Sequence, residues 1–183
     1  MKGKNKDDER GGKHVSLRTI IWLGPFIFLI HDLEEVFLTQ QWIKKHSYLF
    51  KGTVVERLVN TFGYSPGEFG LVVGIITILY GIICYFAAKQ IKAGMSMNLY
   101  AATLLILFIN VFTHLGQSIL LKMYTPGVIT SLLIVLPYTL YAFRKLKAAN
   151  MITKTTWITS LFMSIGMVFI IFGLMFLVGR CFS

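Results

Sequence analysis

A chain of 183 residues is long enough for one domain or one small helical bundle, and 55% of its residues are hydrophobic. Only 14% are charged, whereas a soluble domain carries about 25%. This composition excludes an ordinary soluble domain and predicts an integral membrane protein. The net charge of +10 does not indicate a nucleic-acid partner, because the basic residues lie in short clusters between apolar stretches rather than on one soluble face.

In chain order, residues 1–17 form a basic segment that we expect to be a disordered tail, and residues 18–183 are expected to form a single helical transmembrane domain. A membrane-spanning helix needs about 20 largely apolar residues. Stretches of this kind lie at about 18–40, 68–88, 97–120, 127–143 and 156–179. The predicted fold class is therefore all-α, an integral membrane bundle of about five transmembrane helices.

The segment between the first two stretches, residues 41–64, mixes aromatic and basic side chains. Such a mixture suits an interfacial amphipathic helix, and a solvated loop with a few aromatic anchors is the alternative.

Two helix start signals precede the second and fourth stretches. Ser65-Pro66 and Thr125-Pro126 each place an N-cap residue before a proline, which needs no N–H at the first helical position. Glu68 completes a capping box with Ser65. We therefore expect helices to begin at both prolines.

The distribution of Lys and Arg predicts the orientation. With five spans, twelve of these residues fall on the side of the N-terminus and six on the other side. Because basic residues concentrate in cytoplasmic segments, the bias predicts a cytoplasmic N-terminus and an external C-terminus. The expected location is the bacterial plasma membrane.

The first apolar stretch is interrupted by HDLEE, residues 31–35. In an α-helix His31, Glu34 and Glu35 share one face, while Asp32 lies on its flank. A charged residue at the centre of a membrane span costs about 2.5–3.5 kcal/mol, and each large aliphatic residue returns only about 0.3–0.6 kcal/mol. The carboxylates therefore need partners, and ionisable residues inside a span indicate a functional site.

The third stretch supplies polar side chains at a matching depth. They occupy one arc of the helix and are Asn110, Thr113, His114, Gln117 and Ser118. Under the predicted topology the first and third helices run in the same direction. We therefore expect the two polar faces to meet in the outer half of the bilayer.

This meeting would place two imidazoles beside two carboxylates, a suitable ligand set for a divalent metal such as zinc, iron or manganese. In this hypothesis His31, Glu35 and His114 are metal ligands, and Glu34 is the general base or an outer carboxylate. Two amides would orient the ligands through their other hydrogen-bonding atoms: Asn110 and Gln117. The alternative is a hydrogen-bonded cluster that fixes helix packing without a metal.

The motif residues His31, Glu34 and Glu35 resemble those of the HXXEE family of predicted multi-span membrane proteins. The resemblance covers about residues 20–145 and includes, further along the chain, Asn110, His114, Tyr124, Pro126 and Gly127. It implies a multi-span membrane protein with a site but no particular reaction. Tyr124 is close enough to the third span to serve as a catalytic hydroxyl, although an interfacial anchor is the alternative.

Three classes of function are compatible with these features. The first is an intramembrane enzyme acting on a lipid or another apolar small molecule, as a metal-dependent hydrolase or as an acid–base isomerase or transferase. The second is a proton-coupled transporter, for which a homodimer would be needed to form a convincing pathway. The third is a non-enzymatic membrane partner, such as an immunity or regulatory protein.

Overall fold

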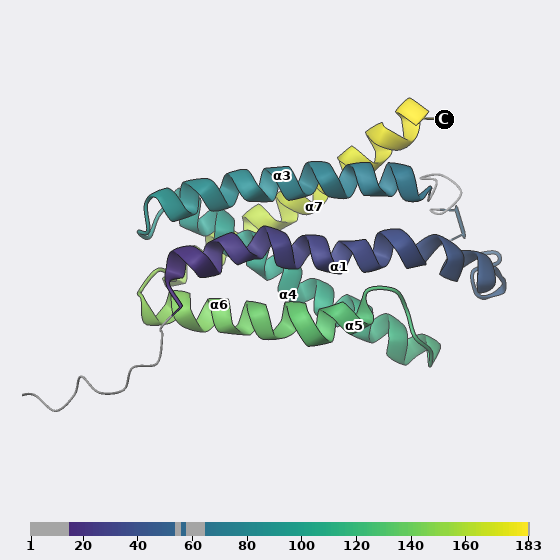
Figure 1. The fold of residues 1–183 in the computed structure, drawn as a ribbon, viewed down its shortest axis with the longest axis horizontal. Helices are drawn as coiled ribbons and strands as arrows, with labels where there is room; N and C mark the ends of the chain where they lie inside the picture. Colours follow the sequence, from purple (N-terminus) through teal and green to yellow (C-terminus); the bar gives the residue numbers. More distant parts are fainter. Residues whose placement is uncertain (1–14, 54–55, 58–64, 183) are drawn as a thin grey trace, which may run out of the picture.

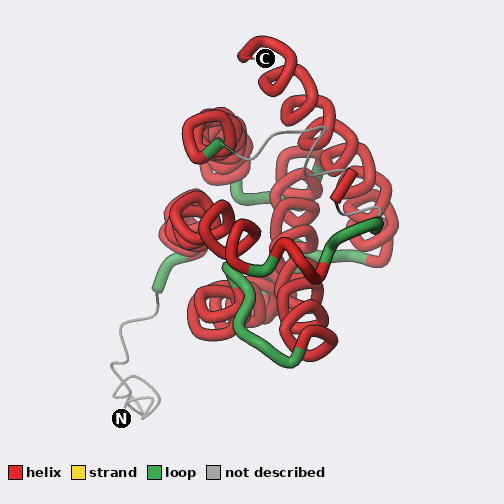
Figure 2. The backbone as a smooth tube through the Cα atoms, turned by 90° about the vertical axis from the view of Figure 1, so that its right-hand side faces the viewer, coloured by secondary structure: helices red, strands yellow, loops and turns green. Residues whose placement is uncertain are grey.

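The structure is a computed structural model that describes residues 15–53, 56–57 and 65–182. The described chain consists of helices and the loops between them (Figure 2). The elements in order are α1 (Leu17–Lys45), η1 (Ser47–Leu49), α3 (Pro66–Lys89), α4 (Met95–Leu121), α5 (Val128–Thr130), η2 (Ser131–Val135), α6 (Leu136–Ala148) and α7 (Lys154–Phe182). The all-α prediction is confirmed. Most of the predicted N-terminal tail and part of the 41–64 segment lie outside the described residues.

The long helices run alternately in opposite directions, so that α1 begins and α7 ends at opposite ends of the bundle (Figure 1). Four helical segments are long and apolar enough to cross a membrane, which suggests a membrane protein: Pro66–Lys89, Met95–Leu121, Val128–Ala148 and Lys154–Cys181. They correspond to the second to fifth predicted stretches. The first stretch forms α1, which extends five residues beyond the predicted end and is made less hydrophobic by its polar residues.

One predicted helix start is confirmed and the other is wrong. The Ser65 hydroxyl accepts a hydrogen bond from the Glu68 amide, and Pro66 is the first residue of α3. By contrast, α5 begins at Val128, and its N-cap is Gly127 in a left-handed conformation (φ 87°) rather than Thr125. Thr125 does not cap a helix. Its hydroxyl lies 2.8 Å from the Ser118 hydroxyl and so ties the loop before α5 to α4.

The fourth span combines two helical geometries. A π-helical turn, η2, leads into α6, whose second residue is Pro137. Proline cannot donate an amide hydrogen bond to the residue four positions earlier, and a π-helical turn is one way in which a helix accommodates the resulting irregularity.

The most tightly packed part of the bundle lies where α1 begins, α3 ends and α4 begins. Its fully buried residues include Ile21, Cys84, Ala87, Tyr100 and Leu104. Small side chains such as Ala87 let helix backbones approach closely, as membrane-embedded helices commonly do. This end therefore forms a closed core, whereas the opposite half of the bundle carries the polar residues of HDLEE.

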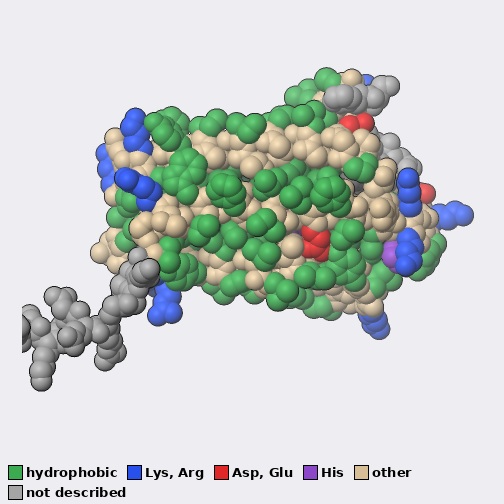
Figure 3. All heavy atoms as spheres, viewed as in Figure 1, with side chains coloured by type: hydrophobic (Ala, Val, Ile, Leu, Met, Phe, Trp, Pro, Cys, Tyr) green, Lys and Arg blue, Asp and Glu red, His purple; other side chains and the backbone are tan. Residues whose placement is uncertain are grey.

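The flank of the molecule is largely hydrophobic, and Lys and Arg gather toward the two ends (Figure 3). Several large side chains of α7 are exposed, among them Phe162 and Phe169. This distribution is the one expected of a protein surrounded by lipid, with basic residues reaching the aqueous interfaces.

Candidate functional site

Three parts of the chain build the polar site. Helix α1 provides the HDLEE residues, α4 provides Asn110 and His114, and the α4–α5 loop together with α5 closes the third side. The predicted meeting of the first and third spans is confirmed at these positions, because the rings of His31 and His114 are 5.0 Å apart between their centres.

His31, Glu35 and His114 form the centre of the site. Each of them offers one ligand atom, and these atoms all lie within 4.8 Å of one another. Nε2 of His114 is 2.8 Å from Oε1 of Glu35. His31 and His114 are buried, whereas the Glu35 carboxylate is partly exposed. We refer to these three residues as the His/Glu cluster.

A chain of hydrogen bonds fixes the orientation of His31. The Thr130 hydroxyl donates to the Glu34 carboxylate at 2.6 Å and lies 2.8 Å from Nδ1 of His31. Because the single hydroxyl proton of Thr130 is directed to Glu34, Nδ1 of His31 must be the donor to Thr130. The lone pair of His31 is then on Nε2, the nitrogen that faces Asn110 in α4.

Glu34 lies on the side of α1 that faces the α4–α5 loop. In addition to the Thr130 hydroxyl, it accepts hydrogen bonds from the Thr130 amide at 3.1 Å and from the Tyr124 hydroxyl at 2.5 Å. Partial burial and the neighbouring Glu34 carboxylate raise the pKa of Tyr124 above its ordinary value, so the phenol stays protonated and able to donate. The two residues predicted as catalytic therefore contact each other.

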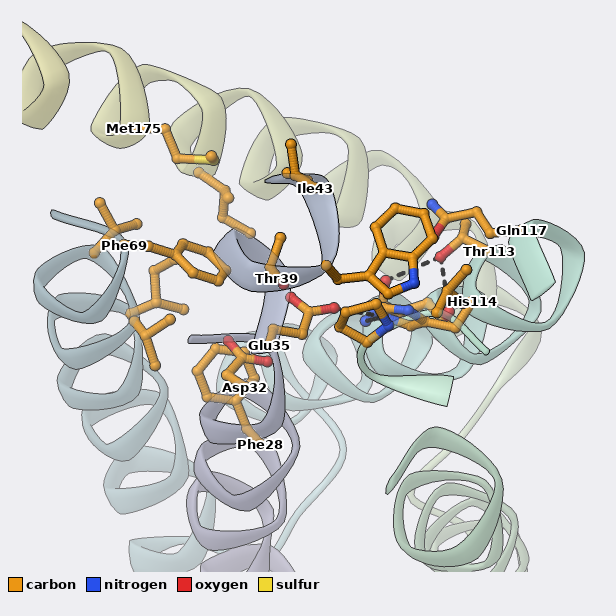
Figure 4. Close-up of a pocket in the computed structure, with 18 of the residues that line it drawn as sticks. Phe28, Asp32, Glu35, Thr39, Ile43, Phe69, Thr113, His114, Gln117 and Met175 are labelled. Carbon is orange, nitrogen blue, oxygen red and sulfur yellow. Dashed lines mark hydrogen bonds and ion pairs between the residues drawn. The ribbon is translucent and has the colours of Figure 1, made fainter. Parts of the chain in front are cut away.

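The two predicted orienting amides differ in their positions. Nδ2 of Asn110 lies 3.0 Å from Nε2 of His31 and 3.1 Å from Nε2 of His114, and the Asn110 carbonyl oxygen accepts a hydrogen bond from Thr113. Gln117 lines a cavity that borders the cluster (Figure 4), and within the described chain it makes no hydrogen bond to the cluster.

Gly127 is in direct contact with the cluster. A Cβ atom at this position would lie 2.8 Å from Oε1 of Glu35 and 2.8 Å from Nδ1 of His114. Only glycine combines this close approach with a φ of 87°. The loop is held in place by Trp42, whose indole N–H donates to the Tyr124 carbonyl at 2.8 Å.

The cluster borders a cavity of about 590 Å³ between α1, α3, α4 and α7 (Figure 4). Polar side chains line one wall, including Glu35, Asn110 and His114. The facing wall is apolar and is formed by residues of α3 and α7 such as Phe69 and Met175. A polar cluster thus faces a predominantly hydrophobic space.

Asp32 points into this cavity beside Glu35 (Figure 4), although helical geometry alone predicted a flanking position. The residue is only 9% exposed, and its carboxylate lies 4.0 Å from Nε2 of His31. No hydrogen bond reaches this carboxylate within the part of the chain that the structure describes. Asp32 is therefore the acidic group of HDLEE that is least committed to other protein groups.

The donor set of the His/Glu cluster fits a divalent metal. Neutral imidazole and carboxylate are common ligands of zinc and of iron. A ligand histidine usually donates its second ring N–H to another group, as His31 does to the Thr130 hydroxyl, which in turn donates to Glu34. His114 has incomplete hydrogen bonding, because its buried Nδ1 has no partner among the described residues. Its Nε2 lies 2.8 Å from Oε1 of Glu35, and because a carboxylate oxygen offers only lone pairs, either a proton on Nε2 or a cation lies between these two atoms.

Two residues of the site were not singled out from the sequence. Thr130 lies in an apolar stretch, where a hydroxyl commonly bonds to its own helix. Trp42 lies in the 41–64 segment, for which only an interfacial helix or a loop with aromatic anchors was expected. The available signal for the loop was its Tyr-Thr-Pro-Gly sequence at 124–127, which differs from Tyr-Ser-Pro-Gly at 64–67 only by Thr for Ser and ends in a glycine suited to a close approach.

The sequence model of a family described as "Protein of unknown function with HXXEE motif" matches residues 22–142. No match to the chain was found among curated proteins or among solved structures. The matched range begins within α1 and ends within α6, so it contains every residue of the His/Glu cluster and excludes α7. The chain belongs to the HXXEE family.

Proposed function

For this member of the HXXEE family, we propose an intramembrane enzyme that acts on a lipid or another apolar substrate with the help of a divalent metal held by His31, Glu35 and His114. One observation carries the proposal: the His/Glu cluster lies at the polar wall of a cavity of about 590 Å³ whose other walls are apolar. Ligand sites are commonly such apolar pockets with a few convergent polar groups.

The residues divide into holding and orienting roles. His31 and His114 would present Nε2 to the metal, and Glu35 would present a carboxylate oxygen. Glu34 and Thr130 would hold His31 in the tautomer whose lone pair is on Nε2. When bound, the metal would polarise a carbonyl or phosphoryl oxygen of the substrate or activate water as a nucleophile.

The proton-transfer role fits Asp32 better than Glu34. The Glu34 oxygens already accept three hydrogen bonds from Tyr124 and Thr130. Asp32 instead faces the cavity without a hydrogen-bond partner among the described residues. We therefore assign Asp32 the position from which a carboxylate can exchange a proton with a substrate, and Glu34 and Tyr124 the support of His31. Hydrolysis is the reaction class that this combination of groups serves most directly, and acid–base isomerisation or group transfer is the alternative.

A second candidate is a cluster that fixes helix packing without a metal. Asn110 favours it, because one side-chain amide reaches Nε2 of both histidines. Such a cluster would suit a non-enzymatic partner protein. A proton-coupled transporter would use the same carboxylates, and it would need a polar path beyond the cavity.

Metal analysis of the purified protein tests the proposal. After equilibration with zinc, iron(II) or manganese and removal of free ions, we expect one tightly bound ion per chain in the wild type. Glu35→Gln should lose this ion, since it replaces a charged ligand by a neutral one of the same shape. Glu68→Gln, in the first turn of α3, is the matched control and should retain the ion. A wild-type protein that binds no metal, or a Glu35→Gln variant that binds it unchanged, would refute the metal site.

A further inference from the structure

A second cavity of about 300 Å³ adjoins the one at the cluster. The two share five lining residues: Phe28, Ile76, Ile106, Leu107 and Ile171. Except for Tyr80 and Thr103, the second cavity is lined by hydrophobic side chains of α1, α3, α4 and α7. The combined space therefore changes from polar at the cluster to apolar at its far end.

The distance from the His/Glu cluster to the far end of this space, measured along α4, corresponds to one leaflet of a bilayer. His114 lines the first cavity and Thr103 the second, both on α4. Eleven residues of α-helix separate them, which is about 16 Å at a rise of 1.5 Å per residue. Half of a hydrocarbon core about 30 Å thick is about 15 Å.

The second cavity also reaches the lipid-facing surface between α3 and α7. Leu79 and Ile82 of α3, which line it, are 44% and 48% exposed, and Ile170 of α7 is 58% exposed. A molecule already dissolved in the bilayer can therefore enter between these two helices without crossing water.

We propose that the two cavities together bind one linear hydrocarbon chain, with the polar head of the same molecule at the His/Glu cluster. The substrate class that follows is a lipid with a chain about one leaflet long, of acyl or isoprenoid type. A helix from a partner is not a suitable occupant. A helical segment about 16 Å long and 10 Å wide fills roughly 1,200 Å³, which is more than the two cavities of about 590 and 300 Å³ offer together. This inference rests on the proposed function for the head group, but the chain site is defined by its own residues.

The probes for the test are palmitic acid and geranylgeraniol, each carrying a photoreactive diazirine at the end of the chain. Both are added to the full-length protein in mild detergent, and the labelled residues are identified by peptide mass spectrometry. We expect labelling to concentrate on the residues around the second cavity in α3, α4 and α7, such as Ile83, Thr103 and Met167. The probe that labels these residues more strongly shows whether the site prefers an acyl or an isoprenoid chain. Labelling spread evenly over the exposed hydrophobic surface would overturn the proposal.

A pair of variants on one helix adds a matched comparison. Ile83 lines the second cavity, whereas Ile78 of the same helix is 66% exposed and lines neither cavity. Ile83→Trp should lower labelling by the palmitic acid probe about tenfold, since each methylene kept out of an apolar site loses stabilisation, and should leave labelling by a decanoic acid probe intact. Ile78→Trp should change neither. Equal labelling of both variants by the long probe would refute the chain site.

Metal content of the same samples separates this inference from the proposed function. Ile83→Trp is expected to retain the bound ion and thus to report on the chain site alone. Labelling confined to the second cavity in a protein without metal would support the chain site and refute the metal site. A bound metal together with labelling spread over the surface would support the metal site and refute the chain site.

Discussion

Gly127 shows how a single residue controls the geometry of the cluster. A Cβ atom at this position would collide with Glu35 and His114, and the residue has a φ of 87°. Its role could be suspected from the Tyr-Thr-Pro-Gly pattern, but the sequence places no neighbour beside it. Contacts between a loop and a distant helix depend on the tertiary structure and cannot be derived from local propensity.

We predict that Gly127→Ala weakens metal binding by about tenfold or more, equivalent to about 1.4 kcal/mol, because the added methyl group displaces His114 or Glu35. Metal titration by isothermal calorimetry measures the effect. Gly52→Ala is the matched control, since Gly52 also has a positive φ, 77°, but its Cβ would meet nothing within 4 Å. Unchanged affinity in Gly127→Ala would show that the loop does not define the site.

The position of Asp32 in the cavity wall could not be predicted from a helical wheel of α1. The wheel gives angles around α1, and it correctly placed His31 and Glu35 toward α4. It could not show that the flank of α1 borders a cavity beside α3 and α7. Asp32 is consequently buried in that wall.

We predict that Asp32→Asn retains the bound metal but loses most of the chemical activity, because an amide cannot exchange a proton as a carboxylate does. Metal content and turnover of the substrate identified by lipid labelling check both parts. Loss of the ion together with activity would instead make Asp32 part of the metal site, and full activity would exclude it from catalysis.

At the scale of elements, α1 joins two halves of the bundle with different properties. Near its start, Tyr138 of α6 donates a hydrogen bond to the Ile20 carbonyl and lies 3.0 Å from the hydroxyl of Tyr100. Farther along, the same helix carries HDLEE beside the cavity. The first half is closed and packed, which suits a support, and the second is open enough to admit a ligand.

We predict that Gly24→Ala destabilises the protein by about 1–3 kcal/mol, the usual cost of overpacking, because its Cβ would meet the hydroxyls of Tyr80 and Tyr138. Thermal unfolding in detergent measures this effect. Gly81→Ala is the control, since a Cβ there meets nothing within 4 Å. Metal affinity of folded Gly24→Ala should match the wild type, since about 10 Å of helix separates Gly24 from His31. A large loss of affinity would show that the halves are not independent.

The extents of the helices were predictable to within a few residues because long apolar stretches and the Ser65-Pro66 start signal are local features. The cap of the fourth span was predicted wrongly, since Thr125 bonds to Ser118 and Gly127 precedes the first helical residue, Val128. The extension of α1 to Lys45 was also missed, because its polar end resembles an interfacial segment.

At the scale of the whole molecule, the helices alternate in direction (Figure 1), and basic residues gather at opposite ends of the bundle (Figure 3). The loops joining α3 to α4 and α6 to α7 lie at the end where α1 begins. Among the described residues this end has seven Lys and Arg and the other end has six, and the sequence before residue 15 contains five more. The His/Glu cluster lies nearer the less basic end.

We predict a cytoplasmic N-terminus and an external C-terminus from this asymmetry. Fusions of green fluorescent protein and alkaline phosphatase to each terminus measure it: fluorescence should appear only with the N-terminal fusion and phosphatase activity only with the C-terminal one. The reverse pattern would show that the protein has the opposite orientation in the membrane. Both termini on one side would show that one of the five helices does not cross the membrane.

The central claim is that His31, Glu35 and His114 hold a metal at the wall of a lipid-binding cavity. Anomalous diffraction from crystals of the lipid-embedded protein, saturated in turn with manganese, iron(II) and zinc, tests it most directly. We expect an anomalous peak at the absorption edge of the bound ion, in contact with Nε2 of both histidines and with the Glu35 carboxylate. A map without this peak, in which the Asn110 amide still bridges the two histidines, would contradict the account.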